Sequence, residues 1–251
     1  MKISVITVAF NAVSTIEETI CSVQAQNYSD IEHIIVDGCS TDGTLEIIEK
    51  CIDKQTRLIS EPDEGIYDAM NKGLSLASGD VVGFLNADDF YPNESVLGDV
   101  AKVFLNENID ACYGDLVYVS NQNPTKIVRY WKSSSFSIGL FRKGWCPPHP
   151  TFFVRSLIYK KYGGFDLKYK MGNDVELMMR FMERYKIKSI YLSKVLVKMR
   201  MGGVSNKSIK NIVKQNIEIL QAAENNNISM SPFSFLYNKI KSRIAQLITR
   251  G

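Results

Sequence analysis

The sequence predicts an α/β fold in which helices flank a mostly parallel sheet. Short segments rich in β-branched and apolar residues, of which residues 3–9 and 31–37 are the clearest, indicate buried strands. Segments with helical spacing follow them, and strands that alternate with helices build parallel sheets. A chain of 251 residues with 45% hydrophobic and 23% charged residues can bury such a core without disulfides or metals.

The first half of the predicted sheet begins with the strand over residues 3–9. Residues 14–17, Ser-Thr-Ile-Glu, have the form of a capping box, which predicts a helix to about Gln26. The second strand ends at Asp37. The polar turn 38–43 then leads into a helix that runs to about Ile52.

Two further strands and a helix complete this half. Residues 56–60 have the composition of a third strand, and apolar residues on one face of 66–77 predict a helix. A fourth strand over 81–85 ends in Asn-Ala-Asp-Asp. Ligands of parallel sheets gather at the carboxyl ends of strands, so we expect Asp37 and the aspartates at 88–89 at one rim.

The rest of the chain is less regular at first. Prolines at 147, 148 and 150 force an extended or turning path within residues 110–155. Helices are expected over residues 174–184 and 206–225, and a last amphipathic segment covers residues 231–251.

Composition argues against several classes of protein. The net charge of +3, without a basic stripe, argues against a nucleic-acid partner. Five cysteines without a Cys-x-x-Cys pair favour reduced thiols in a cytoplasmic protein over a disulfide framework or a zinc knuckle. No run of about 18 apolar residues predicts a membrane span. The apolar start, Met1 to Phe10, lacks a small-residue cleavage site, which favours a strand over a signal peptide.

The pair Asp88-Asp89 is the strongest chemical signal. Adjacent carboxylates repel, which is costly beside a buried strand unless a cation or water offsets the charge. Hard divalent cations, Mg²⁺ or Mn²⁺, are commonly held by one or two carboxylates and a substrate diphosphate. The residues alone leave open a solvated turn after the strand.

Three other polar residues are candidates. Asp37 can accept hydrogen bonds from a base or a ribose, although taken alone it is more simply a cap for the turn over residues 40–44. We expect His33 to be a structural residue of the second strand. His149, between prolines, can donate to a phosphate. No Gly-x-Gly-x-x-Gly or Walker-type loop follows the first strand, which argues against a dinucleotide-binding domain.

Four segments, in this order, resemble the family 2 glycosyltransferases: residues 3–11, 36–44, 60–73 and 85–89. The ordered set is far more specific than any one motif. It is most similar to bacterial enzymes of O-antigen, capsule and colanic-acid synthesis. The resemblance implies a GT-A fold, which is a Rossmann-like, mostly parallel sheet flanked by helices, and an inverting mechanism.

The resemblance also implies the domain organisation, because it runs from residue 1 to about residue 205. Residues 1–205 would form the catalytic domain, with a nucleotide-binding part over 1–90 and an acceptor part over 91–205. Residues 206–251 would form a C-terminal helical appendage.

Roles for single residues follow by position. The resemblance implies that Thr7, Ala9 and Asp37 contact the nucleotide, with Asp37 on the base. Asn71 would lie close to the nucleotide as well. A polar residue on an exposed helix face is the alternative for Asn71. Met70 stands where many members have an arginine, which weakens the expectation of base contacts there.

By the same resemblance, Asp88 would be the principal metal ligand of an Asp-x-Asp-like motif, with Asp89 beside it, near ribose or metal. Asn86 stands where many members have the first aspartate. Asn173-Asp174 takes the place of the family's Glu-Asp pair, so Asp174 would be the general base, alone. The alternative is that these two residues cap the helix that follows.

The last segment predicts a helix that lies in a membrane interface. Apolar residues repeat at helical spacing at Phe233, Leu236, Tyr237, Ile240, Ile244, Leu247 and Ile248, and basic residues accompany them at Lys239, Lys241, Arg243 and Arg250. Residues 231–251 contain no acid, so the basic side chains can reach anionic headgroups. Packing on the catalytic domain or on a second subunit is the alternative.

Together these features predict an inverting sugar transferase at the inner face of the plasma membrane. It would use a UDP- or similar nucleotide sugar, Mg²⁺ or Mn²⁺, and a glycan or lipid-linked acceptor in bacterial surface polysaccharide synthesis. Homo-oligomer formation is left open. A nucleotidyltransferase is the first alternative, but it is expected to have a Gly-rich, basic loop after the first strand, and residues 10–13 are not of that kind. A non-catalytic sugar- or nucleotide-binding module is disfavoured by the presence of both Asp88 and Asp174.

Overall fold

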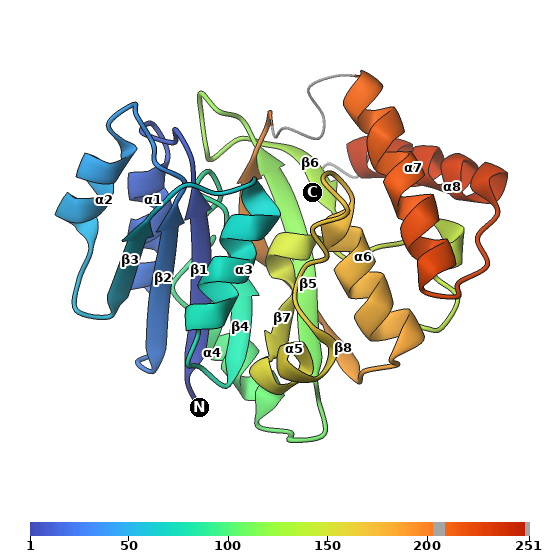
Figure 1. Ribbon diagram of the computed structural model, residues 1–251, viewed down its shortest axis with the longest axis horizontal. Coiled ribbons are helices and arrows are strands. Elements are labelled where there is room, and N and C mark those ends of the chain that lie inside the picture. Colours follow the sequence, from blue (N-terminus) through green and yellow to red (C-terminus); the bar gives the residue numbers. More distant parts are fainter. Residues whose placement is uncertain (203–208, 249–251) are drawn as a thin grey trace.

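One mixed sheet lies at the centre of the molecule (Figure 1). The computed structural model describes residues 1–202 and 209–248. The described strands are β1 (Ile3–Ala9), β2 (Ile31–Asp37), β3 (Thr56–Ser60), β4 (Val81–Phe84), β5 (Ala111–Val119), β6 (Ile127–Trp131), β7 (Phe153–Arg155) and β8 (Ser189–Arg200). They follow the order β3-β2-β1-β4-β7-β5-β6, and β8 pairs with β5.

Helices cover both faces of the sheet (Figure 1). The described α-helices are α1 (Ile16–Gln24), α2 (Thr44–Cys51), α3 (Ile66–Leu76), α4 (Val96–Phe104), α5 (Ser156–Tyr162), α6 (Asn173–Met179), α7 (Ile209–Asn225) and α8 (Pro232–Ile248). Short 3-10 turns lie at Phe141–Lys143 and His149–Thr151, and a π-helical turn, Arg180–Arg184, continues α6.

The alternation of side chains along β1 shows how one strand serves both faces. Ile6 and Val8 belong to the core that contains α3, α5 and α6, whereas Ile3 and Val5 belong to the core beneath α4. Successive side chains of a strand point to opposite faces. A run of seven buried residues is therefore what a strand covered on both sides requires.

The register of the parallel strands positions the candidate site. β1 pairs with β2 so that Ala9 lies opposite Asp37, and it pairs with β4 so that Ile6 lies opposite Phe84. The chain passes from β1 to β2 on one side and places β4 on the other. Such a change in strand order opens a crevice at the carboxyl ends of the strands, and Asn86–Asp89 follows β4 at this rim.

The second half of the sheet is built around β5. It runs antiparallel to β6 and β7 and parallel to β8. Asp115 of β5 is buried, and it accepts hydrogen bonds from Tyr130 Oη (2.7 Å), Ser133 N (2.7 Å) and Tyr191 Oη (2.8 Å). A buried carboxylate needs such partners, so this cluster ties β6 and β8 to β5.

The two C-terminal helices share the core of the sheet domain. Ile219 and Ala222 of α7 and Phe235 of α8 are buried in the same cluster as Phe181. Within residues 1–202 and 209–248, no helix is both long and apolar enough to cross a membrane.

The sequence predicted the bounds of β1, β2 and β3 residue for residue. The predicted capping box at residues 14–17 was wrong. α1 begins at Ile16, and its N-cap Thr15 makes no side-chain capping bond. The Thr15 hydroxyl instead donates to the carbonyl oxygen of Ala12 at 3.3 Å, because the preceding turn brings that carbonyl within reach.

Candidate active site

Asp37 lies fully buried at the carboxyl end of β2. Its carboxylate accepts hydrogen bonds from Ser40 N (3.1 Å), Ser40 Oγ (2.5 Å) and Ser60 Oγ (2.7 Å). Asp37 therefore caps the turn that begins at Ser40, as the sequence suggested. An ionised carboxylate has about four acceptor positions, so Asp37 keeps capacity for one further donor.

The loops after β1 and β2 are tied to each other beside Asp37. Asn11 adopts a left-handed conformation (φ 51°), which asparagine tolerates better than most residues. Its side-chain oxygen accepts a hydrogen bond from Thr41 N (3.0 Å), and its own N–H donates to Ser40 Oγ (2.9 Å). The rim is thus fixed by contacts between segments about 30 residues apart.

Thr7 and Ala9 lie on the buried strand β1. The Thr7 hydroxyl is hydrogen-bonded to His33 Nε2 (2.9 Å), so it is directed at β2 within the sheet. Burial lowers the pKa of His33 to about 4, which makes the ring neutral at neutral pH and fits its expected structural role. Ala9 ends β1 and is 4% exposed, opposite Asp37.

The acidic turn after β4 contains one accessible and one buried carboxylate. Asp88 is partly exposed, whereas Asp89 is fully buried. Burial and the neighbouring Asp88 charge raise the pKa of Asp89 well above its usual range. Asn86 Nδ2 donates to Asp89 Oδ2 (3.3 Å), and Thr19 Oγ1 donates to the Asp89 carbonyl oxygen (2.7 Å).

Two buried oxygen atoms of this turn are candidates for contact with a divalent cation. Asn86 Oδ1 and Asp89 Oδ1 are buried without a hydrogen-bond partner, and buried oxygens of this kind are normally satisfied. Among the described residues, no group of three or more His, Cys, Asp and Glu side chains is arranged to hold a metal ion. A cation here would therefore need Asp88, its neighbours in the turn and oxygens of a substrate, as Mg²⁺ sites commonly do.

α3 starts near the rim and contacts the segment before α6. Asn71 Oδ1 accepts a hydrogen bond from Phe165 N, and its Nδ2 donates to the Phe165 carbonyl oxygen, both at 2.9 Å. Asn71 therefore clamps a backbone segment from the second half of the chain, rather than lying on an exposed face.

Tyr67 is a site residue that the sequence did not single out. Its hydroxyl donates to Asp174 Oδ1 at 3.4 Å, and its ring stacks on Phe165 at 5.4 Å. Burial and the Asp174 charge raise the pKa of Tyr67 well above 10.0, so the hydroxyl stays a donor. Tyr67 and Asn71 are four residues apart, a spacing that places them on one helix face and could have drawn attention to Tyr67.

Asp174 lies in the first turn of α6, whose N-cap is Gly172 without a side-chain capping bond. The side chain of Asn173 instead accepts from Asp166 N (3.1 Å) and donates to the carbonyl oxygens of Asp166 (2.6 Å) and Tyr169 (3.2 Å). Capping by Asn173 and Asp174, the alternative from the sequence, is thus not observed. Asn173 orders the preceding loop.

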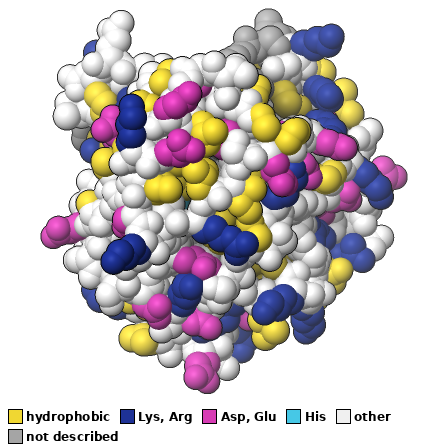
Figure 2. Space-filling model, turned by 60° about the vertical axis from the view of Figure 1, so that its left-hand side comes forward, with side chains coloured by type: hydrophobic (Ala, Val, Ile, Leu, Met, Phe, Trp, Pro, Cys, Tyr) yellow, Lys and Arg dark blue, Asp and Glu magenta, His cyan; other side chains and the backbone are white. Residues whose placement is uncertain are grey.

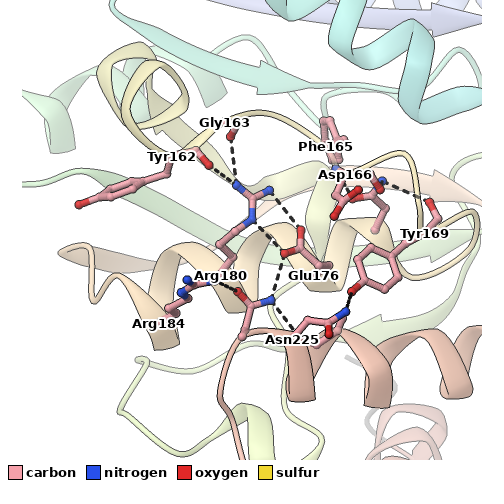
Figure 3. Close-up of polar contacts among 12 residues, drawn as sticks. Tyr162, Gly163, Phe165, Asp166, Tyr169, Glu176, Arg180, Arg184 and Asn225 are labelled. Atoms are coloured by element: carbon pink, nitrogen blue, oxygen red, sulfur yellow. Dashed lines mark hydrogen bonds and ion pairs between the residues drawn. The ribbon is translucent and has the colours of Figure 1, made fainter.

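Figure 3 shows the polar contacts that hold the loop before α6, residues 162–169, beside that helix. Arg180 donates to carbonyl oxygens of residues 162–164 and, through Nε, to Glu176 Oε1 (2.9 Å). Asn225 of α7 donates to the Tyr169 hydroxyl at 2.6 Å. The loop that leads to α6 is therefore fixed from both sides.

Asp174 lines a cavity of about 220 Å³. His149, which is 8% exposed, lines it too and stacks on Phe84 at 5.7 Å between ring centroids. Burial lowers the pKa of His149, and the Asp174 charge opposes this shift. A shallower hollow of about 430 Å³ lies at the amino ends of β2 and β3 and contains none of the candidate catalytic or metal-binding residues.

The surface over the amino-terminal half carries mixed charge. On the face in Figure 2, acidic and basic side chains are interspersed, and several acidic ones lie beside exposed hydrophobic side chains in its upper part.

The site combines a buried strand-end aspartate, an acidic turn and a carboxylate in a cavity on one doubly wound sheet. The model of the family named glycosyl transferase family 2 matches residues 4–184. The chain belongs to this family and is a glycosyltransferase.

Relatives in sequence are also described as glycosyltransferases. An uncharacterized glycosyltransferase of Mycobacterium tuberculosis is 32% identical over 181 residues, which cover 71% of this chain and 68% of that protein. A PGL/p-HBAD biosynthesis glycosyltransferase of Mycobacterium bovis is 29% identical over 208 residues, which cover 81% of this chain and 78% of that protein.

Solved structures confirm the GT-A fold. Residues 1–349 of Staphylococcus aureus TarS in complex with UDP-GlcNAc match with a TM-score of 0.71 at 21% identity, over 100% of this chain and 75% of that one. The mannosyltransferase PcManGT of Pyrobaculum calidifontis, in complex with GDP-Man and Mn²⁺, matches with a TM-score of 0.66 at 18% identity, over 98% of this chain and 70% of that one.

Proposed function

We propose that this glycosyltransferase moves a sugar, with inversion, from a UDP- or similar nucleotide sugar to a hydroxyl of a glycan or lipid-linked acceptor in bacterial surface polysaccharide synthesis. One observation carries the proposal. Asp174 lines a cavity and is contacted by Tyr67 in the first turn of α3, the helix that follows β3. β3 ends beside Asp37 of β2, at the same edge of the sheet. A base and a nucleotide site would then lie on one side of the sheet.

The donor half of the site would use the strand ends. The Asp37 carboxylate can accept a hydrogen bond from the nucleobase of the donor, and Ala9 and Thr7 belong to the strand beside it. Because the Thr7 hydroxyl is paired with His33, a contact from Thr7 would come from its main chain. Asn71 would act near the nucleotide by holding Phe165 in place.

Mg²⁺ or Mn²⁺ would be held by Asp88, with Asp89 and Asn86 as neighbours in the turn. When bound, such a cation neutralises negative charge on the leaving diphosphate. The unpartnered oxygens of Asn86 and Asp89 support this assignment. The similar structure of the mannosyltransferase PcManGT, in complex with GDP-Man and Mn²⁺, supports it further.

The acceptor half would use Asp174. The acceptor hydroxyl oxygen forms a bond to the anomeric carbon, the bond from that carbon to the diphosphate breaks, and the hydroxyl proton passes to the Asp174 carboxylate. Attack opposite the leaving group inverts the anomeric carbon. Tyr67 would hold the carboxylate in place.

A donor screen tests this function. Wild-type protein is heated with a panel of UDP-, GDP- and dTDP-sugars, with Mn²⁺ or with EDTA. We expect one nucleotide class to raise the melting temperature only when the cation is present, because a ligand that binds the folded state stabilises it. A panel without any cation-dependent shift would contradict the proposal.

We also propose that α8 holds the enzyme at the inner face of the plasma membrane. Phe233, Tyr237 and Ile240 are 85%, 63% and 60% exposed along one side of the helix, and Lys241 is exposed beside them. Apolar side chains flanked by basic ones suit an anionic membrane surface. The side chains of Arg243, Ile244, Leu247 and Ile248, and residue Arg250, lie outside the described parts of the chain.

Liposome binding should depend on this exposed side. A double variant, Phe233→Ser with Tyr237→Ser, should co-sediment with anionic liposomes at least about 10-fold more weakly, because burying one large apolar side chain contributes about 1.5–3 kcal/mol. Point variants are preferable to removing α8, because Phe235 of this helix lies in the core.

Leu105→Ser is the matched control, because Leu105 is 78% exposed on another surface. It should bind liposomes as the wild type does. A wild type that does not bind anionic liposomes at low salt would contradict the membrane proposal. If the wild type also sediments as a dimer that the double variant disrupts, the exposed side of α8 contacts a second copy instead.

A further inference from the structure

α7 packs against α6 and the turn before it (Figure 1). Glu218 of α7 is 7% exposed, and its Oε2 accepts hydrogen bonds from Met171 N (2.7 Å) and Gly172 N (3.1 Å). Gln215, one helical turn earlier, donates through Nε2 to the carbonyl oxygen of Met171 at 3.1 Å. Two side chains of α7 therefore hold the Met171–Gly172 turn, which comes directly before the helix that carries Asp174.

Gly172 allows α7 to approach this turn closely. A Cβ at this position would lie 3.1 Å from Ile219 Cγ1, 3.4 Å from the Gln215 carbonyl oxygen and 3.5 Å from Glu218 Cβ. The φ of Gly172 is −120°, a value that residues with a side chain also adopt. The close approach of α7, rather than the backbone conformation, therefore favours glycine here.

α6 is held at a second point from the end of α7. Asn226, directly after α7, is 4% exposed, and its Nδ2 donates to Glu176 Oε1 at 3.1 Å. The same Glu176 oxygen accepts from Arg180 Nε at 2.9 Å. Asp174 lies in sequence between this point and the turn that Glu218 holds, so the backbone that carries the candidate base is restrained on both sides.

Glu218 also lies close to the contact between Tyr67 and Asp174. Burial raises the pKa of Tyr67 well above 10.0, the Asp174 charge adds to this rise, and the Glu218 charge adds further. A charge acts appreciably only on groups near it. Glu218 therefore holds α6 on the side of that helix where the candidate site lies.

We propose that Glu218 is a positioning residue for sugar transfer, a role that rests on the proposed function, in which Asp174 takes the acceptor proton. By accepting the two N–H groups of the Met171–Gly172 turn, Glu218 fixes the direction in which Asp174 leaves α6. A base is effective only when it is aligned with the proton that it takes. The family model matches residues 4–184, so a residue beyond the matched range would complete the site.

Amide hydrogen exchange of the full-length protein, without substrates, tests the contact itself. Glu218→Gln keeps an oxygen at the same reach, whereas Glu218→Met keeps the volume and loses the acceptor. The N–H groups of Met171 and Gly172 should exchange at the wild-type rate in Glu218→Gln. In Glu218→Met they should exchange at least about 10-fold faster, because local opening sets the exchange rate.

Steady-state transfer tests the consequence. Glu218→Met should lower kcat about 10- to 100-fold at an unchanged KM for the donor, because a misplacement of about 1 Å can cost about 100-fold. Glu218→Gln should transfer within a few-fold of the wild type. Glu218→Asp keeps the charge but is one methylene shorter, and it should behave as Glu218→Met does, also if the methionine variant does not fold.

Glu224→Met is the matched control, because Glu224 is exposed in the last turn of the same helix. It should leave both exchange and kcat unchanged. A double variant links the effect to the base. In an Asp174→Asn background, Glu218→Met should lower the remaining transfer by less than about 3-fold, because residues that act through one group are not additive.

Three results would overturn the proposal. Unchanged exchange in both Glu218→Met and Glu218→Asp would show that the contact does not hold the turn. An equal loss of kcat in Glu218→Gln and Glu218→Met would show that the charge acts, not the hydrogen bonds. A full further loss in the Asp174→Asn background would show that Glu218 acts independently of Asp174. Wild-type transfer by Asp174→Asn alone would overturn the base of the proposed function, and the exchange result would still report on the contact.

Discussion

Asp174→Asn is expected to lose at least about 100-fold in sugar transfer, because positioned base catalysis contributes about 10²–10⁴-fold. The change keeps the size of the side chain and an oxygen that Tyr67 can still contact, but removes the basicity. Donor affinity, measured by calorimetry, should be unchanged, since the loss falls on a transition-state interaction.

Asp166→Asn is the matched control. Asp166 lies in the loop before α6, where its carboxylate accepts a hydrogen bond from Lys168 N at 3.1 Å. An amide oxygen can keep that bond, so transfer should stay within a few-fold of the wild type. If Asp174→Asn transfers at the wild-type rate while Asp166→Asn does not, Asp166 is the base and the assignment is wrong.

Asp88→Ala is expected to abolish the cation dependence of donor binding. The cation would offset charge on the diphosphate, an effect worth several kcal/mol, so affinity should fall at least about 100-fold. Calorimetric titration of the nucleoside diphosphate into both proteins, with Mn²⁺ and with EDTA, measures the change.

Asp30→Ala removes one exposed carboxylate away from the rim and serves as the control for net charge. It should bind the nucleotide with the wild-type cation dependence. Equal affinity of wild type and Asp88→Ala, unaffected by EDTA, would exclude a metal at the acidic turn.

The first four strands could be predicted because each is a local signal. Residues 3–9 and 31–37 are continuous apolar runs that end at turn residues, and such runs need no knowledge of distant partners. Their parallel order followed from alternation with helices. The capping box failed because a side-chain hydrogen bond depends on the backbone path before the helix, which the motif does not specify.

The second half could not be predicted in the same way. β5 pairs with β6, β7 and β8, which lie far from one another in sequence. Polar residues such as Asp115 interrupt the apolar pattern of β5, and they are tolerated only because tyrosines from two neighbouring strands donate to them. Such pairings are long-range and leave no local periodicity.

The candidate site likewise contains residues that could be predicted from local signals and contacts that could not. Asp37 and Asp88 could be placed at one rim because strand ends are predictable. The contact between Tyr67 and Asp174 spans 107 residues and required the fold. The sequence predicts that Lys239 accompanies the apolar residues of a membrane-facing helix, but in the structure it contacts Asn216 and lines the cavity. Helical spacing fixes which residues share a side, but not which side packs.

Phosphorus NMR of the reaction products tests the central claim most directly. The donor found in the screen is incubated with the enzyme, Mg²⁺ and a glycan or lipid-linked acceptor, and the nucleotide product is identified. Sugar transfer predicts release of the nucleoside diphosphate in step with acceptor glycosylation. Proton NMR at the anomeric position of the product should then show a configuration opposite to that of the donor. Release of pyrophosphate or transfer of a nucleoside monophosphate would identify a nucleotidyltransferase and contradict the account.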